Sequence, residues 1–183
     1  EDLATNIVRD LTEGIGNTGI RAGIIGEVGA TWPVMPFEEK SLRASARAQK
    51  QTKAPINLHL EPRGGPPYLG PKEWNRQIKE VTLRAIGIME EEGADLRKVV
   101  LSHQDTDLDL ERHIPDYKHH ETLADRGPYI EYDRVGCEYY FDLSGFEEPK
   151  DNERVEAVVK LIDDGYLDHI VLSQDVCFKM YLK

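Results

Sequence analysis

The sequence has few cysteines and few positive charges, and each shortage excludes a class of function. Its two cysteines, Cys137 and Cys177, form no close-spaced metal or redox motif. It carries 23 lysines and arginines against 34 aspartates and glutamates, which gives a net charge of −11. Surfaces that bind nucleic acid or an anionic membrane need clustered cations, so we expect neither partner. The isolated thiols favour a reduced, cytoplasmic setting.

Long apolar runs are missing as well. No run approaches the roughly 18 residues that a membrane-spanning helix requires. The chain opens on Glu1-Asp2 and an acidic, helix-like stretch, which is not the pattern of a signal peptide. The 183 residues are 39% hydrophobic and 31% charged, which predicts one soluble globular domain with a real core over residues 1–183.

Short apolar runs alternate with segments of helical spacing along the whole chain. The expected helices cover residues 3–11, 36–53, 74–93, 110–127 and 155–166, and the expected strands cover residues 20–28, 56–60, 99–102, 129–132 and 170–173. Each strand follows a helix, which predicts an α/β fold with a parallel sheet, because a crossover helix returns the chain to the same edge. An aromatic-rich loop is expected from residue 136 to about residue 150.

Four of these apolar runs stop on a residue that can bind a divalent metal ion, namely Glu27, His59, His103 and Asp175. Any one of them, taken alone, is explained at least as well by a strand that simply ends on a polar residue. In a parallel sheet, however, the C-terminal strand ends share one side, so the four side chains converge if the strands are neighbours. Two imidazoles and two carboxylates suit Zn²⁺, Mn²⁺, Co²⁺ or Fe²⁺. The set therefore predicts a metal site.

The residue types also suit hydrolysis. A carboxylate such as Glu27 can bridge two ions, and two metal ions about 3.5–4 Å apart lower the pKa of a shared water toward 7. Asp175 can bind metal and accept a proton from that water. Arg134, which follows the expected strand over residues 129–132, can position a carbonyl or phosphoryl oxygen. A salt bridge from Arg134 to Asp133 or Glu131 is a nearly equal alternative.

The remaining histidines are predicted to have structural roles. His113, His119 and His120 fall in a polar helix that is expected to be exposed, and His169 precedes the last strand at the end away from the site. Cys177 is expected to be a small apolar filler at the pocket rim.

The motifs resemble the phosphotriesterase-like branch of the metal-dependent amidohydrolases. The matching segments are residues 21–29, 55–59, 100–103, 133–136 and 164–175, in the right order along nearly the whole chain. The likeness is greatest to phosphotriesterase-related proteins and phosphotriesterase-like lactonases, which share the Asp-Arg-x-Gly element of residues 133–136. The resemblance implies a (β/α)₈ TIM barrel with two divalent metal ions, Zn²⁺ being favoured over Mn²⁺, Co²⁺ or Fe²⁺, and a possible homodimer.

The resemblance also implies a role for each candidate residue. Glu27 would bridge the two ions, where some relatives use a carboxylated lysine. His59 and His103 would hold the more exposed ion, and Asp175 would hold the more buried ion and shuttle a proton. Arg134 would lie at the substrate mouth. The implied reaction is attack of a metal-bridged hydroxide on a small-molecule ester, which is a lactone, a carboxylic ester or a phosphotriester.

One part of the family pattern is missing. The first strand of the family carries a His-x-His pair that completes the buried metal site, and no His-x-His occurs in this sequence. The matched segments correspond to strands four to eight of a barrel that needs about 250 residues. We therefore expect an incomplete barrel, with three strands before the sequence and a last helix after it. A natural truncation that holds one metal ion is an alternative.

Two further alternatives stay open from the sequence. The first is a non-catalytic small-molecule binding protein on the same scaffold, which the missing His-x-His pair favours. The second is a different α/β fold in which the strand-end residues never meet. In that case the carboxylate of Glu27 and the imidazole of His103 would lie more than about 8 Å apart, because ligands of one ion each lie about 2 Å from it.

Overall fold

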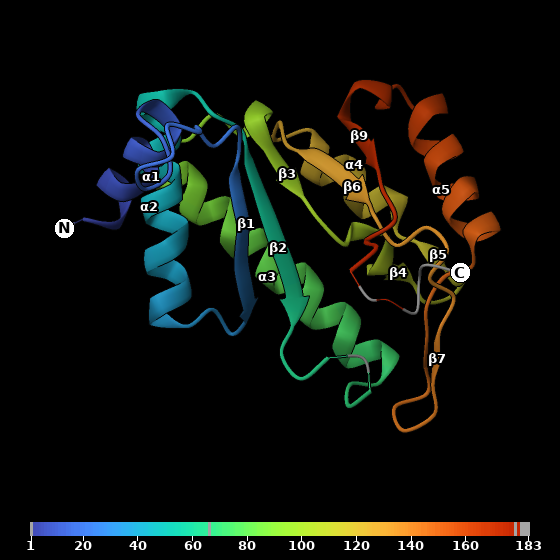
Figure 1. Cartoon of the computed structure of the whole chain (residues 1–183). Helices are drawn as coiled ribbons and strands as arrows, with labels where there is room; N and C mark the ends of the chain where they lie inside the picture. The colour runs from blue at the N-terminus through green and yellow to red at the C-terminus, as the bar shows by residue number, and fades with distance from the viewer. Residues whose placement is uncertain (1, 66, 178, 180–183) are drawn as a thin grey trace.

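Five parallel strands form one sheet in the computed structural model, which describes residues 2–65, 67–177 and 179 (Figure 1). Their spatial order is β1 (Ile25–Trp32), β2 (Ile56–Pro62), β3 (Val99–Leu101), β6 (Tyr129–Tyr132) and β9 (Ile170–Leu172). This order follows the chain, and every neighbouring pair is parallel. The predicted α/β class with a parallel sheet is confirmed. All five C-terminal strand ends therefore lie on one side.

Helices connect the strands and cover one face of the sheet. They are α1 (Leu3–Thr12), α2 (Pro36–Thr52), α3 (Pro71–Glu92), α4 (Tyr117–Ala124) and α5 (Asp151–Asp163), with short 3₁₀ turns η1 (Leu96–Lys98), η2 (Gln104–Thr106) and η3 (Leu167–His169). Helix α1 packs on α2, and Figure 1 shows α3 running behind β1 and β2. None of the described helices is long and apolar enough to cross a membrane.

Helix α3 shows how the sequence builds the core. Pro71 occupies its first turn, where the missing backbone N–H has no helical partner to lose. Trp74, Ile78 and Val81 recur at helical spacing and are buried against the sheet. Gly93 ends the helix with φ of 74°, a left-handed conformation that glycine adopts without strain. The expected helix over residues 74–93 is confirmed, and it begins about one turn earlier.

The first expected strand lies later in the chain than predicted. Residues 20–28 were expected to be extended, whereas β1 covers Ile25–Trp32. Residues before it belong to a turn in which the N–H of Ile15 donates to the carbonyl of Ile20 at 2.8 Å. The start of β1 is set by its pairing with β2, because the first paired residues are Ile25 of β1 and Ile56 of β2.

The expected helix from residue 110 to 127 is wrong over its first half. A two-stranded hairpin, β4 (Leu108–Asp109) and β5 (Ile114–Pro115), replaces it. Pro115 cannot sit inside a helix, because it lacks an N–H and clashes with the preceding turn. The carboxylate of Asp109 accepts the N–H groups of the turn that follows it. Helix α4 begins only after Asp116, whose side chain caps it by accepting the N–H of His119.

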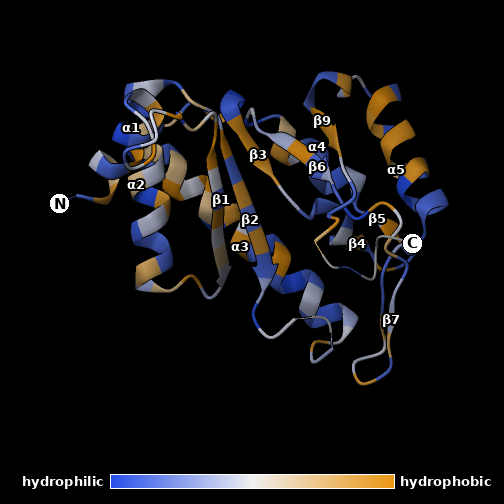
Figure 2. Cartoon of the chain, in the orientation of Figure 1, coloured by the Kyte–Doolittle hydropathy of each residue, from blue (hydrophilic) through white to orange (hydrophobic). Residues whose placement is uncertain are grey.

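The apolar stripe predicted for residues 155–166 faces the core only in part, since Val158 and Tyr166 pack against the core. The helical spacing of Val155, Val158, Val159, Ile162 and Tyr166 predicts one apolar face. Val155, Val159 and Ile162 are nevertheless exposed, at 60%, 46% and 41% of their surface. Arg154 and Leu161 are buried instead, at 2% and 1%. Figure 2 shows hydrophobic residues along α5 as well as along the strands of the sheet. Helix α5 is therefore oriented by a buried charge as well as by apolar packing.

The expected loop from residue 136 to 150 contains a second hairpin, β7 (Tyr140–Phe141) and β8 (Phe146–Glu147). Phe146 is fully buried, and its ring lies 4.9 Å from that of Trp74 in α3, centroid to centroid. One aromatic residue of the hairpin thus packs in the core and fixes the hairpin to the body of the protein.

Candidate metal centre

Three of the predicted ligands come together on neighbouring strands. Glu27 is the third residue of β1 and His59 lies in the middle of β2, so neither strand ends where it was predicted to end, whereas His103 follows β3 after Ser102. The Glu27 Oε2 lies 3.3 Å from His59 Nδ1, and His59 Nδ1 lies 3.2 Å from His103 Nε2. The alternative in which these strand-end side chains never meet is therefore wrong. Gly26 permits the close approach of β1, because a Cβ there would lie 3.0 Å from the Asn57 carbonyl oxygen.

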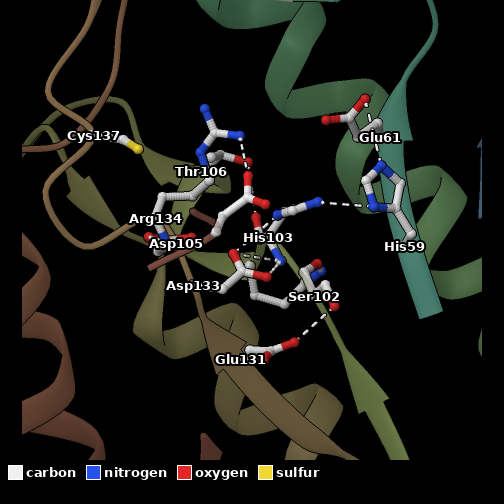
Figure 3. A network of polar contacts seen from close by, with 12 residues as sticks. His59, Glu61, Ser102, His103, Asp105, Thr106, Glu131, Asp133, Arg134 and Cys137 are labelled. Atoms are coloured by element: carbon white, nitrogen blue, oxygen red, sulfur yellow. Dashed lines mark hydrogen bonds and ion pairs between the residues drawn. The ribbon is translucent and has the colours of Figure 1, made fainter. Parts of the chain in front are cut away.

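The ring of His103 is fixed from behind by a carboxylate at the end of β6 (Figure 3). His103 Nδ1 lies 2.9 Å from Asp133 Oδ1, and the backbone N–H of His103 donates to the same carboxylate at 3.1 Å. An ionised carboxylate only accepts hydrogen bonds, so Nδ1 carries the proton. The lone pair of Nε2 then points toward His59, as in the carboxylate–histidine–metal arrangement of many metalloenzymes. Asp133 was predicted only as part of a motif.

The structure adds Glu61 to this group. One ligand atom from each of His59, Glu61 and His103 lies within 4.8 Å of the others. The Glu61 Oε2 is 3.8 Å from His59 Nε2, on the opposite edge of the ring from His103 (Figure 3). Glu61 was not among the residues predicted from the sequence. A signal was present, because residues two apart in a strand share one face.

Two separations in this group match those between ligands of one divalent ion. Two ligand atoms that each lie about 2.1 Å from an ion in tetrahedral geometry are separated by about 3.4 Å. The Glu27–His59 and His59–His103 separations of 3.3 Å and 3.2 Å match that value. The donors are nitrogen and oxygen without a thiolate, which suits Zn²⁺ and its neighbours in the first transition row.

Charges around the two imidazoles raise both of their pKa values. The carboxylate of Glu61 raises the pKa of His59, and His59 in turn lowers the pKa of Glu61. Burial acts to lower the pKa of His103, but the hydrogen bond and charge of Asp133 outweigh it, so that the pKa of His103 is raised. The site thus attracts positive charge, which a divalent ion would supply.

Asp175 and Arg134 form a separate pair beside this group. The Arg134 Nη1 donates to Asp175 Oδ2 at 3.2 Å, and Nη2 donates to Glu148 Oε1 at 2.5 Å. The predicted alternative of a salt bridge from Arg134 to Asp133 or Glu131 is wrong, since Glu148 and Asp175 are its ion-pair partners within the described ranges. In the described part of the chain, Asp175 pairs with Arg134 and lies within 4.0 Å of neither site histidine.

A buried ion pair joins this region to α5. The Arg154 Nε donates to Asp105 Oδ2 at 2.8 Å, and its Nη2 donates to the Cys137 carbonyl at 2.8 Å. Asp105 and Arg154 are only 0% and 2% exposed. Burial, and secondarily the charge of Asp133, raises the pKa of Asp105 to about 7. Asp105 also accepts the backbone N–H of Arg134, so the pair helps to place the Arg134 backbone.

Two histidines predicted to lie in an exposed helix are not exposed. His120 is fully buried, and the side chain of His119 is 16% exposed. His119 Nδ1 lies 2.6 Å from Asp107 Oδ2, and His120 Nδ1 lies 2.8 Å from the Tyr132 hydroxyl. The polar appearance of α4 was misleading, because its histidines satisfy a buried carboxylate rather than solvent. His113 lies in the β4–β5 hairpin, and His169 lies at the N-terminal end of β9, as predicted.

The Asp107 carboxylate makes stability depend on acidity. Burial acts to raise its pKa, but the imidazoles of His119 and His120 outweigh burial, and the pKa of Asp107 is lowered. A lowered pKa gives stability that is present above the unfolded value of about 3.9 and is lost as pH falls through the folded value. We expect Asp107→Asn to lower the free energy of unfolding by about 1–3 kcal/mol at pH 7.

Urea denaturation across pH checks this expectation. The difference between the natural protein and Asp107→Asn should shrink below about pH 4, where the carboxylate itself becomes protonated. Asp164→Asn is the matched control, because its carboxylate lies at the surface beside Lys118. A difference that stays constant from pH 7 to pH 3 would contradict the assignment.

Comparison with known proteins identifies the family. The model of the phosphotriesterase family matches residues 1–183. The chain belongs to the phosphotriesterase family. A phosphotriesterase-related protein of Nematostella vectensis is 36% identical over 185 residues, covering 100% of this chain and 47% of that relative. An N-acetyltaurine hydrolase of Xenopus tropicalis is 35% identical over 179 residues, covering 96% of this chain and 45% of that relative. The chain spans about half the length of these relatives.

Solved structures related to this phosphotriesterase-family chain share its fold. A resiniferatoxin-binding protein from Rhodobacter sphaeroides matches with a TM-score of 0.77 and 37% identity, over 97% of this chain and 44% of that chain. A lactonase from Listeria monocytogenes matches with a TM-score of 0.74 and 25% identity, over 98% of this chain and 45% of that chain. The expected family and the expected incomplete TIM barrel are both confirmed.

Proposed function

We propose that the protein is a metal-dependent hydrolase that cleaves an ester bond in a lactone, a carboxylic ester or a phosphotriester. The observation that carries this proposal is the pairing of His59 in β2 with His103 just after β3, whose ring nitrogens face each other at 3.2 Å. Glu27 lies beside them at 3.3 Å. Membership of the phosphotriesterase family and the similarity to a lactonase support an ester as the substrate.

Each site residue has a proposed task. Glu27, His59 and His103 would hold a divalent ion, with Zn²⁺ favoured by the mixture of imidazole and carboxylate donors. Glu27 has a second oxygen with which it would bridge to a second ion, and Asp175 would be a further ligand there. When bound, such ions supply a hydroxide nucleophile at neutral pH and polarise the oxygen of the bond to be cleaved.

Arg134 and Asp175 would act on the substrate side of this centre. Arg134 is held by Asp175 and Glu148, and a guanidinium has five N–H donors, so it can also donate to a substrate oxygen. Asp175 would accept a proton during the reaction. The cytoplasmic setting and the homodimer stay predictions.

Two relatives favour other outcomes for the same centre. The similarity to N-acetyltaurine hydrolases favours an N-acyl amide as a second candidate substrate. The similarity to a resiniferatoxin-binding protein favours the alternative of a small-molecule binding protein without catalysis. Both alternatives are tested in the same experiment as the ester.

Metal content and turnover test the proposal. We expect the whole protein, purified from metal-replete medium, to hold at least one transition metal ion per chain by mass spectrometry. Lactones, a phosphotriester and an N-acyl amide are then assayed with added Zn²⁺, Mn²⁺ or Co²⁺. We expect ester turnover that a chelator abolishes and that metal restores, because the hydroxide is generated only near a bound ion.

The outcomes separate the three candidates. Amide turnover without ester turnover would replace the ester by the N-acyl amide. Metal binding and ligand binding without turnover of any substrate would support the binding protein. Fewer than one metal ion per chain would contradict metal-dependent hydrolysis altogether.

A further inference from the structure

We propose that Glu61 is a positioning residue for His59, which holds the ring so that Nδ1, and not Nε2, is the atom that binds the metal ion. This inference rests on the proposed function, because it concerns a ligand of the same centre. Its basis is the place of His59 between two neighbours: His103 lies 3.2 Å from Nδ1, and Glu61 lies 3.8 Å from Nε2 (Figure 3).

The two site imidazoles have matching surroundings. His103 turns Nδ1 to the carboxylate of Asp133 and leaves Nε2 for His59. His59 turns Nε2 to the carboxylate of Glu61 and leaves Nδ1 for His103 and Glu27. Each ring thus has a carboxylate on one edge and the shared centre on the other. A carboxylate beside one ring nitrogen favours the proton there and leaves the lone pair of the other nitrogen for the metal. At His103 it acts through a hydrogen bond of 2.9 Å, and at His59 through its negative charge at 3.8 Å.

The geometry favours positioning over direct ligation by Glu61. The two nitrogens of an imidazole lie on different edges of the ring, so an ion bound at Nδ1 faces away from a group that contacts Nε2. The 3.8 Å separation is that of an ion pair, since it exceeds hydrogen-bond range. Glu61 has no lysine or arginine within 4.0 Å among the described residues, so its charge is directed to His59.

The strand gives Glu61 a defined position. Glu61 and His59 lie two residues apart in β2, and their side chains share the face of the sheet that carries the metal centre. Glu61 pairs in register with Thr31 of β1, and Ala30 pairs with Leu60 before it. A carboxylate held by a paired strand keeps its direction better than one in a loop.

Substitution of Glu61 tests the inference in the whole protein. Glu61→Ala removes the carboxylate, Glu61→Gln removes its charge and keeps the shape of the side chain, and Glu73→Gln on the exposed start of α3 is the control. The probe is Co²⁺ alone, measured by competition with a coloured chelator and by its visible absorption spectrum. Two-bond ¹H–¹⁵N spectra of the metal-free protein report which nitrogen of His59 carries the proton.

We expect Glu61→Ala to weaken Co²⁺ binding by roughly 10–100-fold, while the absorption bands at saturation keep their position and intensity. Glu61→Gln should weaken Co²⁺ binding to a similar extent, because a contact at 3.8 Å acts through the charge of the carboxylate. In the metal-free natural protein the Nε2–H form of His59 should dominate, and in Glu61→Ala it should become mixed with the Nδ1–H form.

Other results would overturn the inference. Unchanged Co²⁺ affinity in Glu61→Ala, or an unchanged proton position on His59, would remove the positioning role. Altered band intensity in both variants would instead make Glu61 a direct ligand. These failures are distinct from failure of the proposed function, which would show as absence of Co²⁺ binding by the natural protein.

Discussion

Metal binding should be lost when His103 is replaced by alanine. His103 supplies Nε2 to the shared centre, and its ring is held by Asp133 in a buried position. Loss of a residue that only orients a ligand weakens metal binding by 10–100-fold, so loss of the ligand itself should exceed roughly 100-fold. We expect any metal-dependent turnover to fall with it. Equilibrium dialysis against Zn²⁺ and the turnover assay measure the two losses.

The backbone at His103 calls for a second variant. Its φ of 62° is in the left-handed region, which asparagine adopts more readily than alanine. His103→Asn therefore separates loss of the imidazole from strain in the turn. His169→Gln is the control, because His169 lies at the N-terminal end of β9, away from the metal centre, where its Nδ1 contacts the Pro128 carbonyl. Metal affinity in His103→Asn within threefold of the natural protein would contradict the site.

Replacement of Arg154 by methionine should destabilise the protein by about 3–5 kcal/mol, because removal of one partner of a buried ion pair leaves the other charge uncompensated. The carboxylate left behind is Asp105, which is fully buried. Guanidinium denaturation at pH 8 measures the loss. The loss should be smaller at pH 5, because acid neutralises a carboxyl group whose pKa is already raised to about 7 in the natural protein.

A double variant isolates the pair. Arg154→Met with Asp105→Asn removes both charges, and we expect it to be more stable than Arg154→Met alone. Arg112→Met is the control, since the Arg112–Glu156 pair is about half exposed and such pairs contribute little. Equal losses at pH 5 and pH 8 would show that Asp105 is not the source of the destabilisation.

The sequence predicted most of the sheet and the grouping of three of the four candidate metal ligands. Runs such as residues 56–60 and 99–102 were readable because strands buried on both faces are apolar throughout. Glu27, His59 and His103 could be grouped because parallel strands end on one side of a sheet. This inference needed only the order of the strands in the sheet. When helices and strands alternate along the chain, that order can be predicted from the sequence of neighbouring segments.

What the sequence did not predict depends on contacts between distant residues. The inward direction of α5 is set by Arg154 and Asp105, which are 49 residues apart, and no periodic pattern reveals that pair. The burial of His120 depends on Tyr132, which lies in the next strand. Glu61 could have been found from its spacing to His59, but only if the face of β2 had been considered as well as its end.

Three of the proposed ligands, Glu27, His59 and His103, belong with Glu61 to one stretch of the chain that runs from β1 to just after β3. Ligands that are near in sequence make local unfolding and metal release parts of one equilibrium. An ion bound there would oppose the opening of β1, β2 and β3 by an amount that rises with its concentration, and would have less effect on α5. Metal binding would then slow the hydrogen exchange of backbone amides in β1, β2 and β3. This measurement detects binding without a substrate.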